Sequence, residues 1–149
     1  MGRQYSAYIK GTNYYSGSWF TSCANFTGRA ASDGTGARST VTAGTGYQFI
    51  FCNPGAAYPY AIGYDGTVRC WVQASVFPNA TYGIYYNANG GTGAPGAQTK
   101  TYGSILTLSG TIPIRTGYTF KGWGTSAGTQ TVSYNPGSQY GRDQNGGTY

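Results

Sequence analysis

The sequence has 149 residues and few charges, nine Lys and Arg against three Asp and Glu, which give a net charge of +6. It contains 26 glycines, but aromatic residues make up 17%, and aromatic rings supply the buried area that disordered chains lack, so the composition excludes a disordered protein. Residues that favour strands are common, whereas leucine occurs only at Leu106 and Leu108 and glutamate is absent. We therefore expect a mainly β fold.

The first half of the chain predicts several antiparallel strands. Residues 4–10 alternate as a strand, whereas residues 11–46 are rich in Gly, Ser, Thr, Ala and Asn, which is typical of long loops or short edge strands. Aromatic and β-branched residues then predict strands at 47–52, 58–64 and 67–77.

Two local patterns place the last of these strands. Asp65-Gly66 precedes it and predicts a type I′ hairpin turn, because this pair accommodates positive φ angles. Every second residue of the strand is small and apolar, so one face should lie on a core. These residues are Val68, Cys70, Val72, Ala74 and Val76.

The strand pattern breaks at Pro78-Asn79 and begins again at Tyr82, which predicts two domains, residues 1–79 and 80–149. We expect the first to be an antiparallel β-sandwich or barrel-like domain for anchoring or assembly. For the second domain the sequence predicts, in order, a strand at 82–88, a glycine-rich turn, a short strand at 104–109, an aromatic segment at 113–123 and a hairpin at 129–140.

Four separated pieces of the second half occur in the order of a known repeat: "YYNANGGTGAP", "QTKTYG", "LTLSGTIPIRTGYTFKGWGTS" and "VSYNPGSQY". The region from Tyr82 to Tyr149 thereby resembles the Listeria–Bacteroides repeat, also called the internalin B-repeat. The resemblance implies a small β-grasp-like module of bacterial surface proteins, found also in phage-encoded proteins and not known for catalysis. It does not extend to residues 1–79.

The matching residues imply structural roles. Turns are expected from Asn89, Gly90 and Gly91 at a strand exit, and from Asn135, Pro136 and Gly137 closing a hairpin. Gly117 and Gly122 would allow close backbone approach. The aromatic core of the repeat is expected from Tyr85, Tyr118, Phe120 and Trp123.

The chain departs from the family pattern at its last residues. A complete repeat ends in a strand resembling Leu-Tyr-Ala-x-Trp, whereas residues 144–149 have the composition of a loop. We therefore expect a module that lacks its last strand. Three explanations are open: the module is cut short, it borrows a strand from a neighbour, or it belongs to a longer parent protein. An unpaired sheet edge favours strand addition between subunits, and so a homo-oligomer.

The distribution of charge argues against nucleic acid as a partner. The basic residues are spaced singly along the chain, whereas nucleic-acid binding normally shows a basic cluster or stripe. No apolar run is long enough to insert in a membrane, and the first residues, "MGRQYSAYIKG", have no apolar signal region. The chain is therefore expected either to leave the cell by another route or to belong to a longer surface protein.

The residues for common catalytic chemistry are scarce. Histidine and glutamate are absent, and Asp33, Asp65 and Asp143 each stand in turn-like sequence, so backbone-bonding turn residues are expected rather than catalytic acids. Scattered acids and the absence of a CxxC pair predict no metal and no cofactor. The odd set Cys23, Cys52 and Cys70 is expected to consist mainly of buried free thiols, with a disulfide as the alternative.

Aromatic residues near turns in the first half form a candidate contact surface, because rings with polar tips suit protein or sugar contacts. The alternative is that they supply core area in a leucine-poor chain. These residues are Tyr14, Tyr15, Trp19, Tyr58 and Tyr60, with Tyr64 nearby.

Together these patterns predict a non-enzymatic structural and adhesive protein. The favoured hypothesis is a phage virion component, such as a capsid-decorating, head-fibre or tail-associated subunit located in the virion. The alternative is a fragment of a secreted bacterial adhesin or filament protein at the cell surface. Expected partners are other subunits and a host-surface glycan or protein, without nucleic acid.

Overall fold

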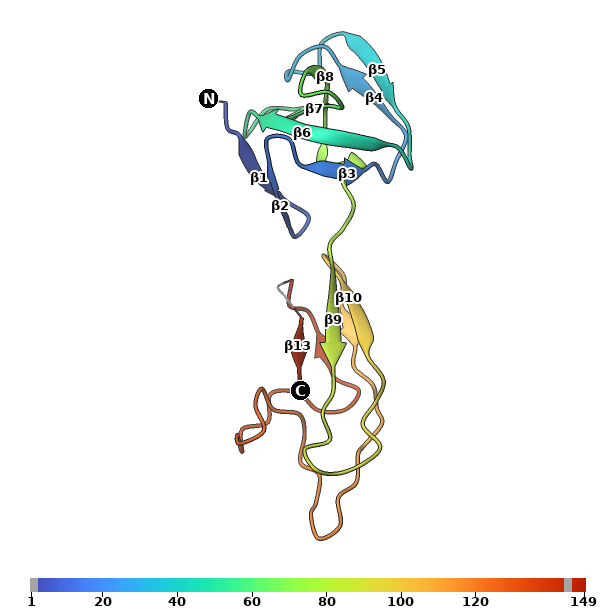
Figure 1. Cartoon of the computed structure of the whole chain (residues 1–149), viewed down its shortest axis with the longest axis vertical. Coiled ribbons are helices and arrows are strands. Elements are labelled where there is room, and N and C mark those ends of the chain that lie inside the picture. Colours follow the sequence, from blue (N-terminus) through green and yellow to red (C-terminus); the bar gives the residue numbers. More distant parts are fainter. Residues whose placement is uncertain (1–2, 144–145) are drawn as a thin grey trace. The chain divides into compact units, whose positions relative to one another are not determined.

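The computed structural model describes residues 3–143 and 146–149 and confirms a mainly β fold with antiparallel sheets. The chain divides into two compact units, unit 1 (Met1–Asn79) and unit 2 (Ala80–Tyr149). Figure 1 shows the strands of both units in sequence colours.

Unit 1 is built on a six-stranded antiparallel sheet in the order β3-β6-β7-β8-β4-β5. The region expected to be loops or short edge strands supplies four short strands, three of them in this sheet. The strands of the sheet are β3 (Trp19–Thr21), β4 (Phe26–Arg29), β5 (Ala37–Val41), β6 (Gly46–Cys52), β7 (Tyr60–Gly63) and β8 (Val68–Val72).

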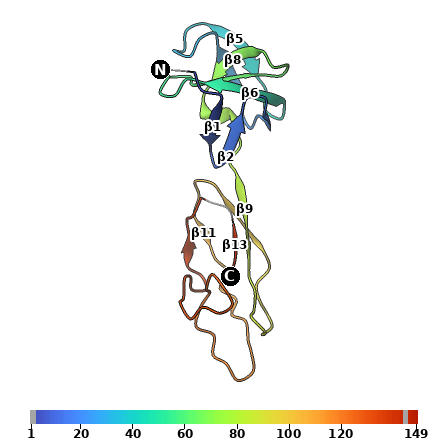
Figure 2. The same cartoon turned by 60° about the vertical axis from the view of Figure 1, so that its left-hand side comes forward.

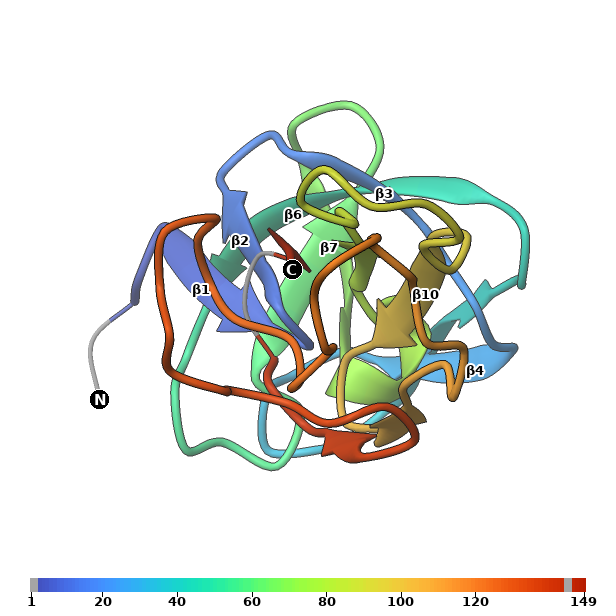
Figure 3. The same cartoon turned by 90° about the horizontal axis from the view of Figure 1, so that it is seen from below.

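A two-stranded hairpin of β1 (Ser6–Ile9) and β2 (Thr12–Tyr15) packs against one face of this sheet, beside β6 (Figures 1 and 3). Ile9 and Tyr14 from the hairpin join Phe49 and Ile62 from the sheet in one buried cluster. Tyr14 contacts Phe77 edge-on, with ring centroids 5.2 Å apart. The hairpin thus provides the second layer of the core.

Bulges divide the buried residues of the sheet between its two faces. A register shift between Phe49 and Phe51 in β6 leaves Phe49 in the main cluster and places Ile50 and Phe51 in a second cluster on the opposite face. A second shift, opposite Val68, sends this residue to that face as well. The strict alternation expected for the last strand is therefore wrong at Val68, because the bulge adds one residue to β8.

Two expectations for the end of unit 1 are corrected. The strand ends at Val72, and the chain continues as a 3₁₀ turn, η1 (Ala74–Val76), which buries Val76 in the main core. The turn between β7 and β8 is not type I′, because Gly66 has φ +80° but Asp65 has no positive φ. Asp65 instead accepts a hydrogen bond from the Thr67 backbone N–H, as turn aspartates do.

Unit 2 contains a three-stranded sheet and a separate strand pair (Figures 1 and 2). In the three-stranded sheet, the central β9 pairs antiparallel with β10 and parallel with the last strand, β13. The strands of the unit are β9 (Thr81–Tyr85), β10 (Gln98–Thr101), β11 (Leu106–Thr107), β12 (Gln139–Tyr140) and β13 (Gly147–Thr148).

The last residues of the chain differ from the sequence expectation. Residues 144–149 were expected to form a loop, but Gly147 and Thr148 pair with Ile84 and Tyr85 of β9; Gln144 and Asn145 lie outside the described residues. The backbone of Gly83 passes close enough for this pairing because Gly146 has no Cβ: one built there would stand 1.8 Å from the Gly83 carbonyl oxygen. The parallel first and last strands are compatible with a β-grasp-like order, which stays a prediction, since the described residues of unit 2 contain no α-helix.

Candidate functional site

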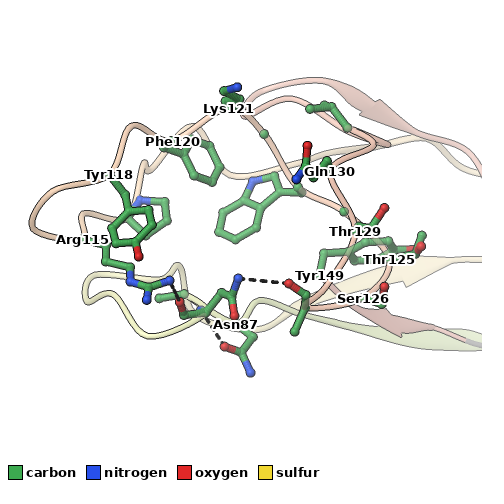
Figure 4. A pocket seen from close by; sticks show the side chains of 18 of the residues that line it. Asn87, Arg115, Tyr118, Phe120, Lys121, Thr125, Ser126, Thr129, Gln130 and Tyr149 are labelled. Atoms are coloured by element: carbon green, nitrogen blue, oxygen red, sulfur yellow. Dashed lines mark hydrogen bonds between the residues drawn. The ribbon is translucent and has the colours of Figure 1, made fainter.

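The candidate site is a cavity of about 500 Å³ in unit 2 (Figure 4). The turn after β9, the aromatic segment 113–124, the following loop to Val132 and the end of the chain line this cavity. In Figure 4, Arg115, Tyr118 and Phe120 lie on one side, and Thr125, Ser126, Thr129 and Tyr149 lie on the other. The two sides differ in chemistry.

Trp123 anchors the aromatic side and is 2% exposed. Its backbone forms a bridge with Tyr134, and its ring contacts Phe120 edge-on with centroids 4.9 Å apart and Tyr86 at 4.8 Å. A Cβ on the neighbouring Gly122 would lie 2.4 Å from a Val132 methyl carbon, so this glycine lets the two segments pack closely. Within the described residues, the Trp123 indole Nε1 has no hydrogen-bond partner.

Arg115 connects the aromatic side to the turn after β9. Its Nη1 donates a 3.0 Å hydrogen bond to the Asn89 carbonyl oxygen, and its guanidinium lies 4.0 Å from the centre of the Tyr118 ring. Lys121 is a second, exposed cation on the lining, and none of the described lining side chains is acidic. The side chains of the lining therefore carry a net positive charge.

The opposite side presents hydroxyl and amide groups from Thr125, Ser126, Thr129 and Gln130. The Asn89 side chain donates a 3.2 Å hydrogen bond to the Ala127 carbonyl oxygen and so ties this loop to the turn after β9. Because both sides are attached to the same turn, the structure holds aromatic, cationic and hydroxyl groups around one space.

Residues 82–146 match the model of the Listeria-Bacteroides repeat domain. The matched residues lie within unit 2. The match confirms the resemblance seen in the sequence, whereas the finer comparison with internalin stays a prediction. No curated protein and no solved structure matches the chain.

The first predicted turn of the repeat, at Asn89, Gly90 and Gly91, forms where these residue types favour it. Asn89 and Gly90 have φ +50° and +87°, and the Gly91 N–H donates to the Ala88 carbonyl oxygen, which makes a turn with two left-handed residues. Gly91 has no positive φ, but a Cβ there would lie 2.5 Å from the Ile114 carbonyl oxygen. It allows close backbone approach instead.

The second turn, at Asn135, Pro136 and Gly137, closes with a hydrogen bond from the Ser138 N–H to the Asn135 carbonyl oxygen. It does not close a hairpin, because Tyr134 before it pairs with Trp123 and β12 after it pairs with β11. The turn redirects the chain between two pairings. Gly117 has φ +81° with open space around it, so its role is conformational rather than close approach.

Two of the four aromatic residues expected in the core of the repeat are exposed. Tyr85 is 54% exposed because Ile84 takes the inward position of β9, and Tyr118 is 66% exposed because it ends a turn that begins at Arg115. Trp123 is buried and Phe120 is half-buried. The tyrosines that pack the core instead are Tyr86, Tyr134, Tyr140 and Tyr149.

The candidate contact surface of unit 1 also divides. Tyr14 is 4% exposed in the main core, and Tyr60 packs partly buried against the same cluster, so core packing explains both. Tyr58 is half-buried against Phe26, with ring centroids 5.9 Å apart. Tyr15 and Trp19 remain exposed, at 61% and 59%.

Sequence reasoning missed further exposed rings in unit 1. These are Tyr5 and Tyr8 of the first strand region, which are 60% and 56% exposed, whereas Tyr64, named above beside the candidate surface, is 51% exposed. Tyr5 lies near Phe51 at 6.2 Å between ring centroids, and Arg3 lies 4.0 Å from the centre of the same ring. The alternation of residues 4–10 was visible, but the face that would be covered was not.

Asp33 and Asp65 accept hydrogen bonds from the backbone of their own turns, as expected, whereas the expectation is wrong for Asp143, which bonds distant groups. Asp33 accepts hydrogen bonds from the Thr35 hydroxyl and N–H, and these hold the pKa of its carboxyl below the usual value. Asp65 pairs with Arg69. Asp143 accepts a 2.6 Å hydrogen bond from the fully buried Lys100 ammonium, and this bond, with a second from the Gly103 N–H, lowers its pKa.

The remaining reactive side chains of unit 1 are its cysteines. Cys23, Cys52 and Cys70 are free, and only Cys23 is exposed. Cys52 and Cys70 lie on β6 and β8, which β7 separates, and burial raises both pKa values, that of Cys70 to about 11. The described residues contain no group of three or more His, Cys, Asp or Glu that could hold a metal ion. Nor does this part of the chain include a helix that is both long and apolar enough to cross a membrane.

Proposed function

We propose that this chain is a non-enzymatic structural and adhesive protein that displays the repeat of unit 2 on the surface of a larger assembly. In the more specific form of the proposal, the assembly is a phage virion, with the chain as a capsid-decorating, head-fibre or tail-associated subunit. The match of residues 82–146 to a repeat of bacterial surface proteins carries the proposal.

Unit 1 would attach the repeat to other subunits. Its sheet ends at β3 and β5, and the outer edge of a strand can pair with another chain. Exposed aromatic residues such as Trp19 and Tyr15 add contact area of the kind enriched in protein interfaces. Both features support assembly through unit 1, including assembly of identical copies.

The state of the acids supports a function without catalysis. General acid catalysis at neutral pH needs a carboxyl with a raised pKa, but the pKa values of Asp33 and Asp143 are lowered by the hydrogen bonds they accept. The cavity of unit 2 has no acidic side chain on its described lining. Its aromatic and hydroxyl groups suit binding.

A secreted bacterial adhesin or filament protein, of which this chain would be a fragment, is the second candidate. The same repeat match favours it, because the repeat family belongs to bacterial surface proteins. The two candidates share the display of unit 2 and differ in the assembly that carries it.

Quantitative mass spectrometry of purified virions and of the cell-surface fraction from the same culture tests the proposal. The virion form predicts the chain in purified particles at a fixed ratio to the major capsid protein. Recovery from the cell-surface fraction alone would contradict the virion form and support the adhesin. Recovery of the chain in neither fraction, but in the soluble cytosol, would overturn display itself.

A further inference from the structure

We propose that the cavity of unit 2 is a binding site for an acidic oligosaccharide, that is, sugar rings carrying carboxylate or phosphate groups. This inference rests on the proposed display function and adds a ligand class to it. Three features of the cavity carry it: an accessible aromatic side, a hydroxyl-rich opposite side and two cationic side chains without an acidic side chain beside them.

The aromatic side offers a flat surface for a sugar ring. Tyr118 is 66% exposed, although it lies beside the half-buried Phe120 and the buried Trp123. Exposed rings on the wall of a concave site provide large contact areas at low entropic cost, and the C–H face of a sugar is apolar. The Arg115 guanidinium, 4.0 Å from the Tyr118 ring centre, restrains this ring before a ligand binds.

The opposite side provides hydrogen-bonding groups in a sequence of small polar residues. Thr125, Ser126 and Gln130 are exposed and line the cavity, so their hydroxyl and amide groups can donate to and accept from sugar hydroxyls. The Trp123 side chain lines the cavity, and its Nε1 is a buried donor without a partner in the described part of the chain.

Charge selects an acidic saccharide over a neutral one. Arg115 and Lys121 line the cavity, and Asp143, the acid that the sequence of unit 2 provides, is paired with Lys100 away from the lining. The Arg115 side chain has one Nη bonded to Asn89 and keeps further donors for an anion. Two separate cations suit single anionic groups on sugars rather than a nucleic-acid backbone, which needs a longer basic stripe.

Titration of the ¹⁵N-labelled full chain, followed by NMR, tests the proposal with four probes: a tetragalacturonate, a phosphorylated maltotetraose, neutral chitotetraose and an acidic peptide of equal charge. We expect saturable shifts at the Trp123 indole N–H and the Gln130 amide with at least one of the two acidic saccharides. Tetragalacturonate and phosphorylated maltotetraose distinguish carboxylate from phosphate as the anionic group. Equal binding of chitotetraose, or binding of the peptide alone, would overturn the proposal, as would no saturable binding of any probe.

Matched variants then locate the site. Tyr118→Ala should weaken binding of the best acidic probe about fivefold or more, because it removes the exposed ring. Lys121→Gln should weaken it about two- to threefold, an effect that disappears at high salt. Tyr85→Ala, which removes a comparably exposed ring outside the cavity, is the control and should bind normally.

The titration of these variants and the recovery of the chain in particles test the saccharide site and the display function separately. If Tyr118→Ala and Lys121→Gln bind as well as the Tyr85→Ala control, the cavity is not the site and the inference fails, whereas recovery of the chain in particles would be unaffected. If the chain is absent from virions and cell surfaces but the titration succeeds, display fails and the saccharide site stands.

Discussion

Unit 1 and unit 2 build their cores from different groups. The main cluster of unit 1 joins Phe49, Ile62 and Val72, all fully buried, with rings from the β1–β2 hairpin. Unit 2 has Ile84 and Leu108 at its centre, surrounded by tyrosines, and it buries the charged Lys100 completely. The Tyr140 and Tyr149 hydroxyls, 3.2 Å apart, lie beside this cluster.

The difference shows two ways of folding a chain that is poor in leucine. Unit 1 stacks a hairpin on a wide sheet, so its core is mainly aliphatic and aromatic, and polar atoms such as the Tyr47 hydroxyl, which accepts from the Thr42 N–H, are a minor part of it. Unit 2 has short strands, and its tyrosines and lysine bring polar atoms that need hydrogen bonds inside the fold. We therefore expect unit 1 to respond most strongly to changes of shape and unit 2 to changes of charge.

Phe49→Ala should have the largest effect. Its ring is fully buried and contacts Tyr14, so its removal leaves a cavity that costs about 3–5 kcal/mol of the free energy of unfolding. Urea unfolding followed by NMR signals of each unit measures the loss, which should fall on unit 1. Trp19→Ala, an exposed ring on the same sheet, is the control and should change stability by less than about 0.5 kcal/mol.

Gly28→Ala should follow as a test of close packing in unit 1. A Cβ at this position would lie 2.3 Å from the Cys70 sulfur, so the sheet must shift to accept it, at a cost of about 1–3 kcal/mol. Thermal unfolding measures the loss. Gly44→Ala would introduce a methyl group into open space at a position with φ +83°, and therefore reports backbone strain without the clash.

Acid should destabilise unit 2 through Asp143. The folded pKa of this carboxyl lies below its ordinary value because Lys100 and the Gly103 N–H donate hydrogen bonds to it. Its contribution to the free energy of unfolding is therefore complete above about pH 4 and is lost as the pH falls through the folded pKa. The difference in melting temperature between the wild-type chain and Asp143→Asn should therefore shrink from about pH 6 to about pH 2. A difference that stays constant across this range would contradict the assignment.

Thiol reactivity gives the smallest change and tests burial without altering the fold. In the native chain, a disulfide reagent such as Ellman's reagent should modify Cys23 and spare Cys52 and Cys70, which are 3% and 1% exposed and have raised pKa values. All three should react in denaturant. Cys23→Ser should remove the native reaction, and rapid modification of two or more thiols in the native chain would show that the core of unit 1 opens.

The parts of the fold that depend on local sequence could be predicted. Strand-forming runs gave β6 and β7, and Asn89-Gly90 gave a left-handed turn, because these residue types favour their conformations without tertiary contacts. The bulges in the sheet could not be predicted, since Phe49 to Cys52 is a continuous apolar run that suits either face, and the extra residue appears only on pairing with β7.

The candidate site was predicted only in part, for a related reason. Trp123 and Phe120 belong to the repeat pattern and lie on the cavity, but Tyr118 was expected in the core and instead lies exposed beside Arg115. In the sequence, Arg115 and Lys121 are isolated charges. They line one cavity only after distant segments pair, as Thr92 does with Ile114. Periodicity in one segment does not contain that information.

A double-mutant cycle between Lys100 and Asp143 tests the contrast between the two cores most directly. Asp143→Asn leaves a buried ammonium without its counter-charge, whereas Lys100→Met replaces it by an apolar chain of similar length, and Asp143 keeps the Gly103 N–H. We predict that Asp143→Asn lowers the urea midpoint of unit 2 more than Lys100→Met, and that adding Lys100→Met to Asp143→Asn restores part of the loss. Strictly additive losses would contradict a core of unit 2 held by this ion pair.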